Sequence, residues 1–533
     1  MTTVGAALAE GLAVRGIQVA FGIPGVHTVE IYRGLAASGL RHVTARHEQG
    51  AAFMADGYAR VAGRPAAICV ITGPGLTNAL TGMAQARADS VPMLVVSGAG
   101  ATAGLGRGLG YLHELPNQRA LAAQVALASE QVDAPEDLGP ALDRTIAPFS
   151  TGRPGPTHIA VPLDVASMPC PPLPLPAAVA VPEPDAATVV RAARYLSSAR
   201  APVILAGGGC RRAAAALRAV AEALGAPVVQ TVNARGTMHA HPLGVPASPS
   251  LGAVRALIEG ADVVLAVGTE LGRTDFDMYA TGTMPRMRGL VRIDRCADQL
   301  VRHPAKLVLH ADAGATLAAL RPLLTGPPAA NGAGRAAATR AAAWAEMGPA
   351  LRAASDLLGT LRDAVPGAVI VGDSTHPVYA GNLFYDHDRP GGWFNAATGF
   401  GALGYAIPAA IGAAVADPDA PVICLTGDGG AQFTLPEVMT AVDERLPILF
   451  LVWNNRGYAE IASAMRGAGT PALGCDPTPP DFAHAARSFG IPHALATPDS
   501  TSLRHAVAAL SPRDGPAMLE IAIPAAHRSD EGS

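Results

Sequence analysis

Lysine is almost absent from this sequence of 533 residues. Lysine and arginine together number 39, but only one of these residues, Lys306, is a lysine. Pyridoxal-phosphate enzymes and Schiff-base aldolases need a catalytic lysine that reacts with the substrate or cofactor carbonyl. Because Lys306 stands in an ordinary His-Pro-Ala-Lys-Leu segment, the sequence argues against both kinds of enzyme.

The sequence also lacks the marks of secreted, disulfide-rich and membrane-spanning proteins. Its six cysteines form no CxxC pair, and several lie in apolar runs, which is typical of reduced, buried thiols. No run of 18 uncharged apolar residues occurs, and the first residues lack the basic and apolar segments of a secretory signal. We therefore expect a soluble, cytoplasmic protein without a membrane partner.

Charged residues are scarce as well. They make up only 15% of the chain, and the net charge is −4 at pH 7. This balance offers no basic surface for nucleic acid or for anionic lipid. Hydrophobic residues reach 50%, and glycine and proline are scattered rather than periodic, which indicates a well-packed globular protein.

Two stretches rich in proline, glycine or alanine divide the chain. Residues 169–184 contain seven prolines and should run extended over a surface. Residues 325–340 have the composition of a second linker. The predicted domains are therefore 1–168, 185–324 and 341–533.

Each block alternates short apolar runs with helix-length segments rich in alanine and leucine. This alternation is typical of parallel sheets covered by helices on both faces. The sequence therefore predicts an α/β fold of three doubly wound parallel-sheet domains. The expected strands lie within 19–25, 66–73, 93–99 and 157–163, then 202–209, 262–268 and 290–294, and finally 368–374, 421–429, 448–455 and 517–523.

The clearest site motif lies in the third block. One apolar run leads into Gly-Asp-Gly-Gly at 427–430. After a spacing of 24 residues, counted from Gly430 to Trp453, a second apolar run ends in Asn-Asn-Arg-Gly-Tyr at 454–458. Glycines after a parallel strand let backbone N–H groups approach phosphate oxygens. A carboxylate, an amide oxygen and a backbone carbonyl at two strand ends suit Mg²⁺, with diphosphate and water as further ligands.

The paired motifs resemble the metal–diphosphate signature of thiamine-diphosphate (ThDP) enzymes of the acetolactate synthase and 2-oxo acid decarboxylase superfamily. The resemblance extends over nearly the whole chain, through the three-block layout and the segments 22–25, 46–65, 72–78 and 399–413. It implies a pyrimidine-binding first domain, a Rossmann-like central domain and a diphosphate-binding third domain. ThDP and Mg²⁺ are the implied cofactors.

The resemblance also assigns roles to single residues. Glu48 would hydrogen-bond N1′ of the aminopyrimidine, which requires a sequestered carboxyl group with a raised pKa. Leu403 would wedge beneath the bent cofactor, with the Leu403 N–H on N3′ and the Gly401 carbonyl on the 4′-amino group. The implied metal ligands are Asp428, Asn455 and Gly457. The other implied cofactor-binding residues are Pro74, Asn78, Ser374, Thr375, His376, Gly427, Gly429, Gly430 and Tyr458.

Two histidines are the implied catalytic residues on the substrate side. His27 stands after Val26, as in benzaldehyde lyase, and His113 stands where acetolactate synthases have a glutamine. We expect both to carry protons, unless either is merely structural. Residues 24–35, 112–118 and 372–382 are most similar to those of bacterial 5-guanidino-2-oxopentanoate decarboxylases.

We expect no flavin, because the Gly-Gly-Gly-Cys-Arg-Arg segment at 207–212 does not complete GxGxxG. The predicted function is ThDP- and Mg²⁺-dependent decarboxylation of a small-molecule 2-oxo acid with release of an aldehyde. A carboligase like acetolactate synthase or benzaldehyde lyase stays open, as does a non-catalytic ThDP-fold subunit. No predicted strand is followed by GxGxxG, and this absence argues against an NAD-linked dehydrogenase.

The resemblance finally implies an oligomer. In the family, the pyrimidine domain of one chain faces the diphosphate domain of another. We therefore expect a homodimer or homotetramer in which Glu48 and Asp428 of one active site come from different subunits.

Overall fold

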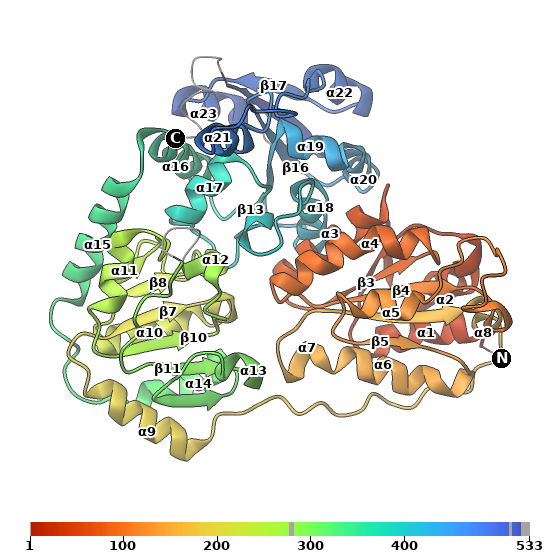
Figure 1. Cartoon of the computed structure of the whole chain (residues 1–533), viewed down its shortest axis with the longest axis horizontal. Coiled ribbons are helices and arrows are strands. Elements are labelled where there is room, and N and C mark those ends of the chain that lie inside the picture. The colour runs from red at the N-terminus through yellow and green to blue at the C-terminus, as the bar shows by residue number, and fades with distance from the viewer. Residues whose placement is uncertain (1, 277–281, 511–513, 524–533) are drawn as a thin grey trace.

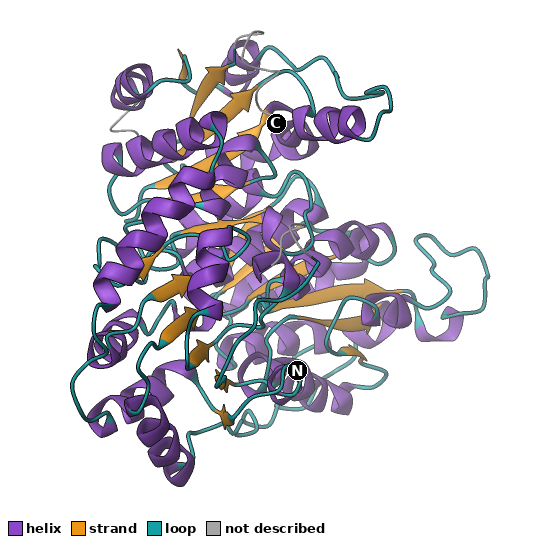
Figure 2. Cartoon of the chain, turned by 60° about the vertical axis from the view of Figure 1, so that its left-hand side comes forward, coloured by secondary structure: helices purple, strands orange, loops and turns teal. Residues whose placement is uncertain are grey.

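The computed structural model describes residues 2–276, 282–510 and 514–523, which form three lobes (Figure 1). Each lobe contains one six-stranded sheet, and the strands of every sheet pair in parallel. Helices lie on both faces of the sheets (Figure 2). The predicted α/β class with three parallel-sheet domains is confirmed.

The first sheet has the strand order β2-β1-β3-β4-β6-β5. Its inner strands are apolar on both faces because helices cover both. The strands are β1 (Val19–Gly22), β2 (Arg41–Thr44), β3 (Ala66–Val70), β4 (Met93–Ala99), β5 (Ser129–Gln131) and β6 (Pro156–Pro162). The helices are α1 (Val4–Val14), α2 (Val29–Ser38), α3 (Glu48–Ala62), α4 (Pro74–Ala88), α5 (Gln118–Ala123), α6 (Leu138–Ile146), α7 (Pro148–Thr151) and α8 (Leu163–Ala166).

The central sheet has the order β12-β11-β10-β7-β8-β9. Its strands are β7 (Val203–Ala206), β8 (Val228–Gln230), β9 (Gly244–Val245), β10 (Val264–Val267), β11 (Val291–Asp294) and β12 (Leu307–His310). The accompanying helices are α9 (Ala186–Ser197), α10 (Ala214–Leu224), α11 (Gly252–Glu259), α12 (Arg273–Phe276), α13 (Ala297–Leu300), α14 (Ala313–Leu320) and α15 (Gly332–Glu346).

The third sheet has the order β14-β13-β15-β16-β18-β17. Its strands are β13 (Val369–Gly372), β14 (Trp393–Asn395), β15 (Val422–Gly427), β16 (Ile448–Asn454), β17 (His493–Ala496) and β18 (Ala517–Ala522). Its helices are α16 (Pro349–Ala364), α17 (His376–Leu383), α18 (Ala406–Ala416), α19 (Asp428–Thr434), α20 (Val438–Asp443), α21 (Ala459–Gly467), α22 (Phe482–Phe489) and α23 (Ser500–Ala509).

The two predicted linkers differ in structure. Residues 170–184 contain no helix or strand and run between the first and central lobes (Figure 1). The second prediction is wrong over most of its length, because α15 begins at Gly332 and packs against α11 and β9. Alanine is the best helix former, and the alanine-rich composition that suggested a linker instead forms this helix.

The first and third lobes share a core through α3 and α18, which lie side by side. Two glycines allow the backbones to touch: a Cβ on Gly57 would lie 2.0 Å from the Ala409 carbonyl oxygen, and one on Gly412 would lie 1.9 Å from that of Met54. These contacts show that the two helices are antiparallel.

A buried ionic network joins all three lobes. The Arg60 guanidinium donates to Asp56 at 2.6 Å and to Asp89 at 2.7 Å in the first lobe, and to Asn233 of the central lobe at 3.0 Å. Thr398 of the third lobe donates to Asp89 at 2.8 Å. Because unpaired buried charges are costly, this network favours one arrangement of the lobes. Within the described ranges, no helix combines the length and apolar character that a membrane crossing needs.

Candidate active site

Three strand ends of the third sheet bring most of the predicted cofactor residues together. Ser374, Thr375 and His376 follow β13, the glycine-rich turn follows β15, and Tyr458 follows β16. A Cβ on Gly427 would lie 3.1 Å from Thr375 Oγ1, and one on Gly429 would lie 2.5 Å from the Tyr458 ring. Side chains at these two glycines would therefore fill the space between the strand ends.

Asp428 is the first residue of α19 and only 1% exposed. Neither oxygen of its carboxylate has a hydrogen-bond partner within the part of the chain that the structure describes. Burial raises the pKa of Asp428 to about 6, opposed by the nearby backbone N–H of Asn455. A buried carboxylate without partners is costly, so a bound cation would stabilise it. The donor types at Asp428, Asn455 and Gly457 suit a hard divalent ion.

The loop that carries Gly401 and Leu403 is anchored by a residue that the sequence analysis missed. The Asp373 carboxylate, 1% exposed, accepts from Gly404 N at 2.9 Å and from Ser374 N at 2.8 Å. Burial raises the pKa of Asp373 to about 6. An acidic residue directly after a buried strand was the available signal.

Glu48, Pro74 and Asn78 form a second group in the first lobe. Glu48 begins α3 and accepts from Asn78 Nδ2 at 2.9 Å, while Pro74 begins α4. The helices run parallel, since Glu48 meets Asn78 at one end and Arg60 meets Asp89 at the other. The predicted residues of this lobe therefore gather where the two helices begin.

Glu437 holds the start of α3 and was also missed. Its carboxylate, 1% exposed, accepts from Arg46 N at 3.0 Å and from His47 N at 2.9 Å, and burial raises its pKa. A Cβ on Gly50 would lie 2.1 Å from Glu437 Oε1. The sequence signal for Glu437 was that it is a single acidic residue in an otherwise uncharged helical stretch.

His27 and His113 meet near this group. Their ring centroids are 5.7 Å apart at an interplanar angle of 82°. Burial, together with the charge of His113, lowers the pKa of His27, and His27 Nδ1 is buried without a partner among the described residues. The Glu114 carboxylate accepts from four backbone N–H groups of residues 108–111, which holds the loop that carries His113. A cavity of about 230 Å³ lies beside His113.

The two groups of residues lie far apart within one chain. The antiparallel helices α3 and α18 cross where Gly57 meets Ala409. Glu48 lies before this crossing along α3, and Leu403 lies three residues before the start of α18, on the opposite side of the crossing. At 1.5 Å of rise per residue, Glu48 and Leu403 of one chain are about 20 Å apart. One chain therefore presents two separate groups of predicted cofactor residues, which we call the first-lobe half-site, with Glu48, and the third-lobe half-site, with Asp428.

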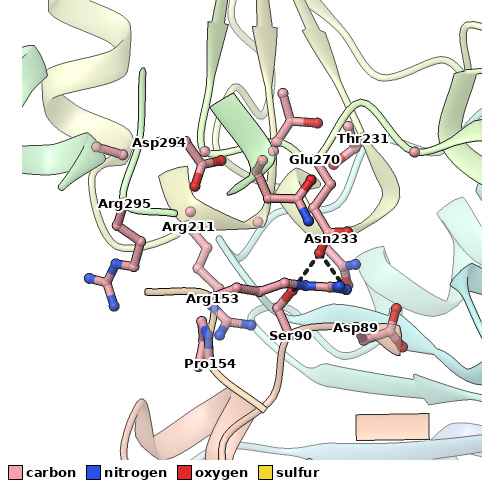
Figure 3. A pocket seen from close by; sticks show the side chains of 18 of the residues that line it. Asp89, Ser90, Arg153, Pro154, Arg211, Thr231, Asn233, Glu270, Asp294 and Arg295 are labelled. Carbon is pink, nitrogen blue, oxygen red and sulfur yellow. Dashed lines mark hydrogen bonds and ion pairs between the residues drawn. The ribbon is translucent and has the colours of Figure 1, made fainter. Parts of the chain in front are cut away.

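A cavity of about 470 Å³ lies between the central lobe and the first (Figure 3). It opens at the ends of β7 and β10, where the strand order reverses, which is the usual ligand position in such sheets. Arg211 and Asp294 line it, and Arg153 bonds Ser90 at 2.8 Å and Glu270 at 2.7 Å. The volume is in the range of small-molecule sites. The expectation that no flavin binds stays a prediction.

Comparison with known families decides where the protein belongs. The thiamine pyrophosphate enzyme N-terminal TPP binding domain matches residues 2–121, the central domain matches 189–320, and the C-terminal TPP binding domain matches 372–521. The chain belongs to the thiamine pyrophosphate enzyme family. The two TPP binding domains of this family coincide with the lobes that carry the two half-sites.

Named relatives in this family are enzymes. A probable 2-ketoarginine decarboxylase of Pseudomonas aeruginosa is 41% identical over 92% of this chain and 88% of its own length. The acetolactate synthase large subunit of Corynebacterium glutamicum is 31% identical over 84% of this chain and 74% of its own, and acetolactate synthase isozyme 1 of Escherichia coli is 30% identical over 83% and 80%. The chain is therefore a thiamine pyrophosphate-dependent enzyme, and the alternative of a non-catalytic subunit is wrong.

Proposed function

We propose that this enzyme uses thiamine diphosphate and Mg²⁺ to decarboxylate a 2-oxo acid and release an aldehyde. The observation that carries the proposal is the buried carboxylate of Asp428, beside a glycine turn at a strand end, which accepts no hydrogen bond from the residues that the structure describes. Asp428, the Asn455 side chain and the Gly457 carbonyl would hold Mg²⁺, and the glycine turn would hold the diphosphate. When bound, thiamine diphosphate supplies the electron sink for loss of CO₂.

The chain's own residues would control the protons of this reaction. Glu48 would hold a proton at N1′ of the aminopyrimidine, with Asn78 orienting its carboxylate. The Leu403 N–H and the Gly401 carbonyl would orient the same ring. His27 and His113 would deliver a proton to the decarboxylated substrate, which favours release of the aldehyde.

The substrate that we propose is a 2-oxo acid with a guanidino group. This rests on the likeness to the Pseudomonas aeruginosa protein, whose name includes 2-ketoarginine. The likeness to acetolactate synthases favours a second candidate, in which the decarboxylated substrate joins a second carbonyl compound.

A substrate panel tests both candidates. The enzyme, loaded with thiamine diphosphate and Mg²⁺, is incubated with 5-guanidino-2-oxopentanoate, pyruvate and 2-oxobutanoate, with and without acceptor aldehydes, and products are identified by mass. We expect one aldehyde per CO₂ from the guanidino acid. A coupled product that forms faster than free aldehyde would instead establish the carboligase.

We further propose that active sites form between two chains, in a homodimer or homotetramer. The separation of about 20 Å between Glu48 and Leu403 supports this, because one chain cannot present both to the same aminopyrimidine ring. Exposed apolar side chains lie in both half-sites, including Leu112 in the first lobe and Phe400 in the third. A partner chain would cover such surfaces. The cytoplasmic location expected from the sequence stays a prediction.

A further inference from the structure

The side chain of Gln118, at the start of α5, connects the ends of two neighbouring strands in the first-lobe half-site. Its Oε1 accepts from Thr72 Oγ1 at 2.8 Å and from Gly73 N at 2.9 Å, just after β3. Its Nε2 donates to Ser97 Oγ at 2.9 Å and to Gly98 O at 2.7 Å, near the end of β4. These four bonds use both amide hydrogens and two acceptor positions, so the hydrogen-bonding capacity of the amide is fully used.

The two backbone positions that Gln118 joins lie against the two histidines. Gly73 has φ +65°, and a Cβ there would lie 2.5 Å from the His113 carbonyl oxygen and 2.9 Å from His113 Cβ. A Cβ on Gly98 would lie 3.1 Å from both Cβ and the carbonyl oxygen of His27. Each histidine therefore rests on a glycine backbone, and the distance between these glycines influences the distance between the rings.

The contacts also determine which way the amide points. The Gly73 N–H can only donate, and the Gly98 carbonyl can only accept, so an exchanged amide would lose both bonds. A carboxylate at position 118 would keep the shape but place an oxygen against the Gly98 oxygen. The site therefore requires a group that accepts on one side and donates on the other.

From this geometry we propose that Gln118 is a positioning residue that holds His27 and His113 at the separation that proton delivery to the decarboxylated substrate requires. The inference rests on the proposed function, since it takes the pair as the proton carriers. Gln118 lines the cavity beside His113, but its amide is fully bonded to protein groups. It would therefore act through Gly73 and Gly98 rather than on the reacting atoms. A misplacement of about 1 Å in a catalytic group can cost about a hundredfold in rate.

The test compares Gln118→Met and Gln118→Glu with Gln124→Met, which alters an exposed glutamine at the end of the same helix. Three quantities are measured on the loaded enzyme: kcat, KM for the 2-oxo acid, and hydrogen–deuterium exchange at the thiazolium C2. For both Gln118 variants we expect kcat to fall about 10- to 100-fold, with KM and C2 exchange unchanged. C2 exchange depends on Glu48, which Gln118 does not contact, so a local change at position 118 should leave the exchange rate unchanged. A general loss of structure would instead lower both kcat and the rate of C2 exchange.

His27→Ala and His113→Ala separate this inference from the proposed function. If both keep wild-type kcat, the histidines carry no proton, and the proposed role of the pair fails together with that of Gln118. If they lower kcat while Gln118→Met does not, only the positioning role is overturned. If Gln118→Met lowers kcat and C2 exchange together, its role is merely structural and the proposal is also overturned.

Thr72→Val keeps the test valid should Gln118→Met fail to fold. This change removes one of the four hydrogen bonds to the amide and preserves the side-chain shape. The loss of one neutral hydrogen bond predicts a fall in kcat of about fivefold, again with unchanged C2 exchange. An unchanged kcat in this variant would overturn the proposal.

Discussion

The two half-sites of this enzyme use different kinds of chemical groups. The first-lobe half-site presents ionisable side chains, Glu48, His27 and His113, at helix starts and in a loop. The third-lobe half-site presents mainly glycine backbone at strand ends, together with the buried carboxylate of Asp428. The first is suited to moving protons and the second to holding an anionic cofactor with its metal.

The half-sites also differ in how they are supported. Asp428 directly follows the central strand β15, which pairs with β13 on one side and β16 on the other. The histidines instead depend on contacts between separate segments, including the bonds of Gln118 and Glu114. We therefore expect changes in the third-lobe half-site to affect binding, and changes in the first-lobe half-site to affect the rate of reaction.

The largest expected effect comes from Asp428→Ala. Without this carboxylate, Mg²⁺ loses its charged protein ligand, and the diphosphate loses the positive charge of the bound metal. We therefore expect the affinity for thiamine diphosphate to fall by more than about 100-fold. Calorimetric titration with thiamine diphosphate, with and without Mg²⁺, measures it, and chelation of the metal should have the same result in the wild type. The exposed Asp419→Ala is the control. Normal affinity in Asp428→Ala would refute the metal assignment.

Glu48→Gln should separate chemistry from binding. The amide cannot share a proton with N1′, so C2 exchange should slow by about 10²- to 10⁴-fold while cofactor affinity stays the same. NMR of the exchanging thiazolium proton measures the rate. If the exchange rate does not change, Glu48 has no part in activation.

Mixed dimers test whether the two half-sites belong to different chains. Glu48→Gln and Asp428→Ala enzymes, each inactive, are mixed after reversible dissociation. Half of the random dimers then contain one intact site and one doubly damaged site, so we expect about a quarter of wild-type activity. A site within one chain would give none. Exchange of differently tagged subunits shows whether mixing occurred.

The smallest expected effect comes from His158, which hydrogen-bonds Ser97, one of the residues that Gln118 contacts. His158 Nε2 bonds Ser97 Oγ at 2.8 Å, and Nδ1 bonds Ser129 Oγ at 2.8 Å. Ser129 Oγ donates to Arg119 O, so His158 Nδ1 must donate and Nε2 must accept from Ser97. This chain of bonds requires a neutral imidazole, and burial lowers the pKa of His158 to about 3.

This shift makes stability depend on pH. Between about pH 6.5 and 3 the unfolded chain binds a proton at His158 that the folded chain excludes, so the free energy of unfolding falls as pH decreases. His158→Gln should make this decline shallower by at most about 1.4 kcal/mol per pH unit. Urea unfolding from pH 7 to 4 measures it, with the exposed His505→Gln as control. Equal slopes in wild type and His158→Gln would show that the imidazole is protonated in the folded state.

The strands predicted from sequence are those at the centres of the sheets. All eleven expected runs contain a strand, including the pair β15 and β16 beside the metal site. The missed strands lie at or next to the edges: β2 and β5, then β8, β9 and β12, and finally β14 and β17. Central strands are apolar on both faces and stand out as continuous runs. The edge strand β2 instead carries exposed polar residues, and the edge strand β5 consists of three half-buried polar residues.

The residues that we propose for the chemistry stand out in the sequence in the same way. Asp428 and Asn455 follow long central strands at a characteristic spacing, and Glu48 begins a helix in a distinctive segment. The roles of their supports were not predictable, because Asp373, Glu437 and Gln118 act through contacts with residues distant in the chain. A local pattern cannot report which backbone N–H a buried carboxylate will reach.

The amino-acid order alone was enough to specify the parallel sheets, the glycine turn at 427–430 and the residue types of both half-sites, because periodicity and strand-end chemistry are local properties. The separation of the half-sites came only from the packing of α3 against α18. Antiparallel contact at Gly57 and Gly412 puts Glu48 and Leu403 on opposite sides of the crossing. That arrangement depends on how two distant helices fit together, which no single segment encodes.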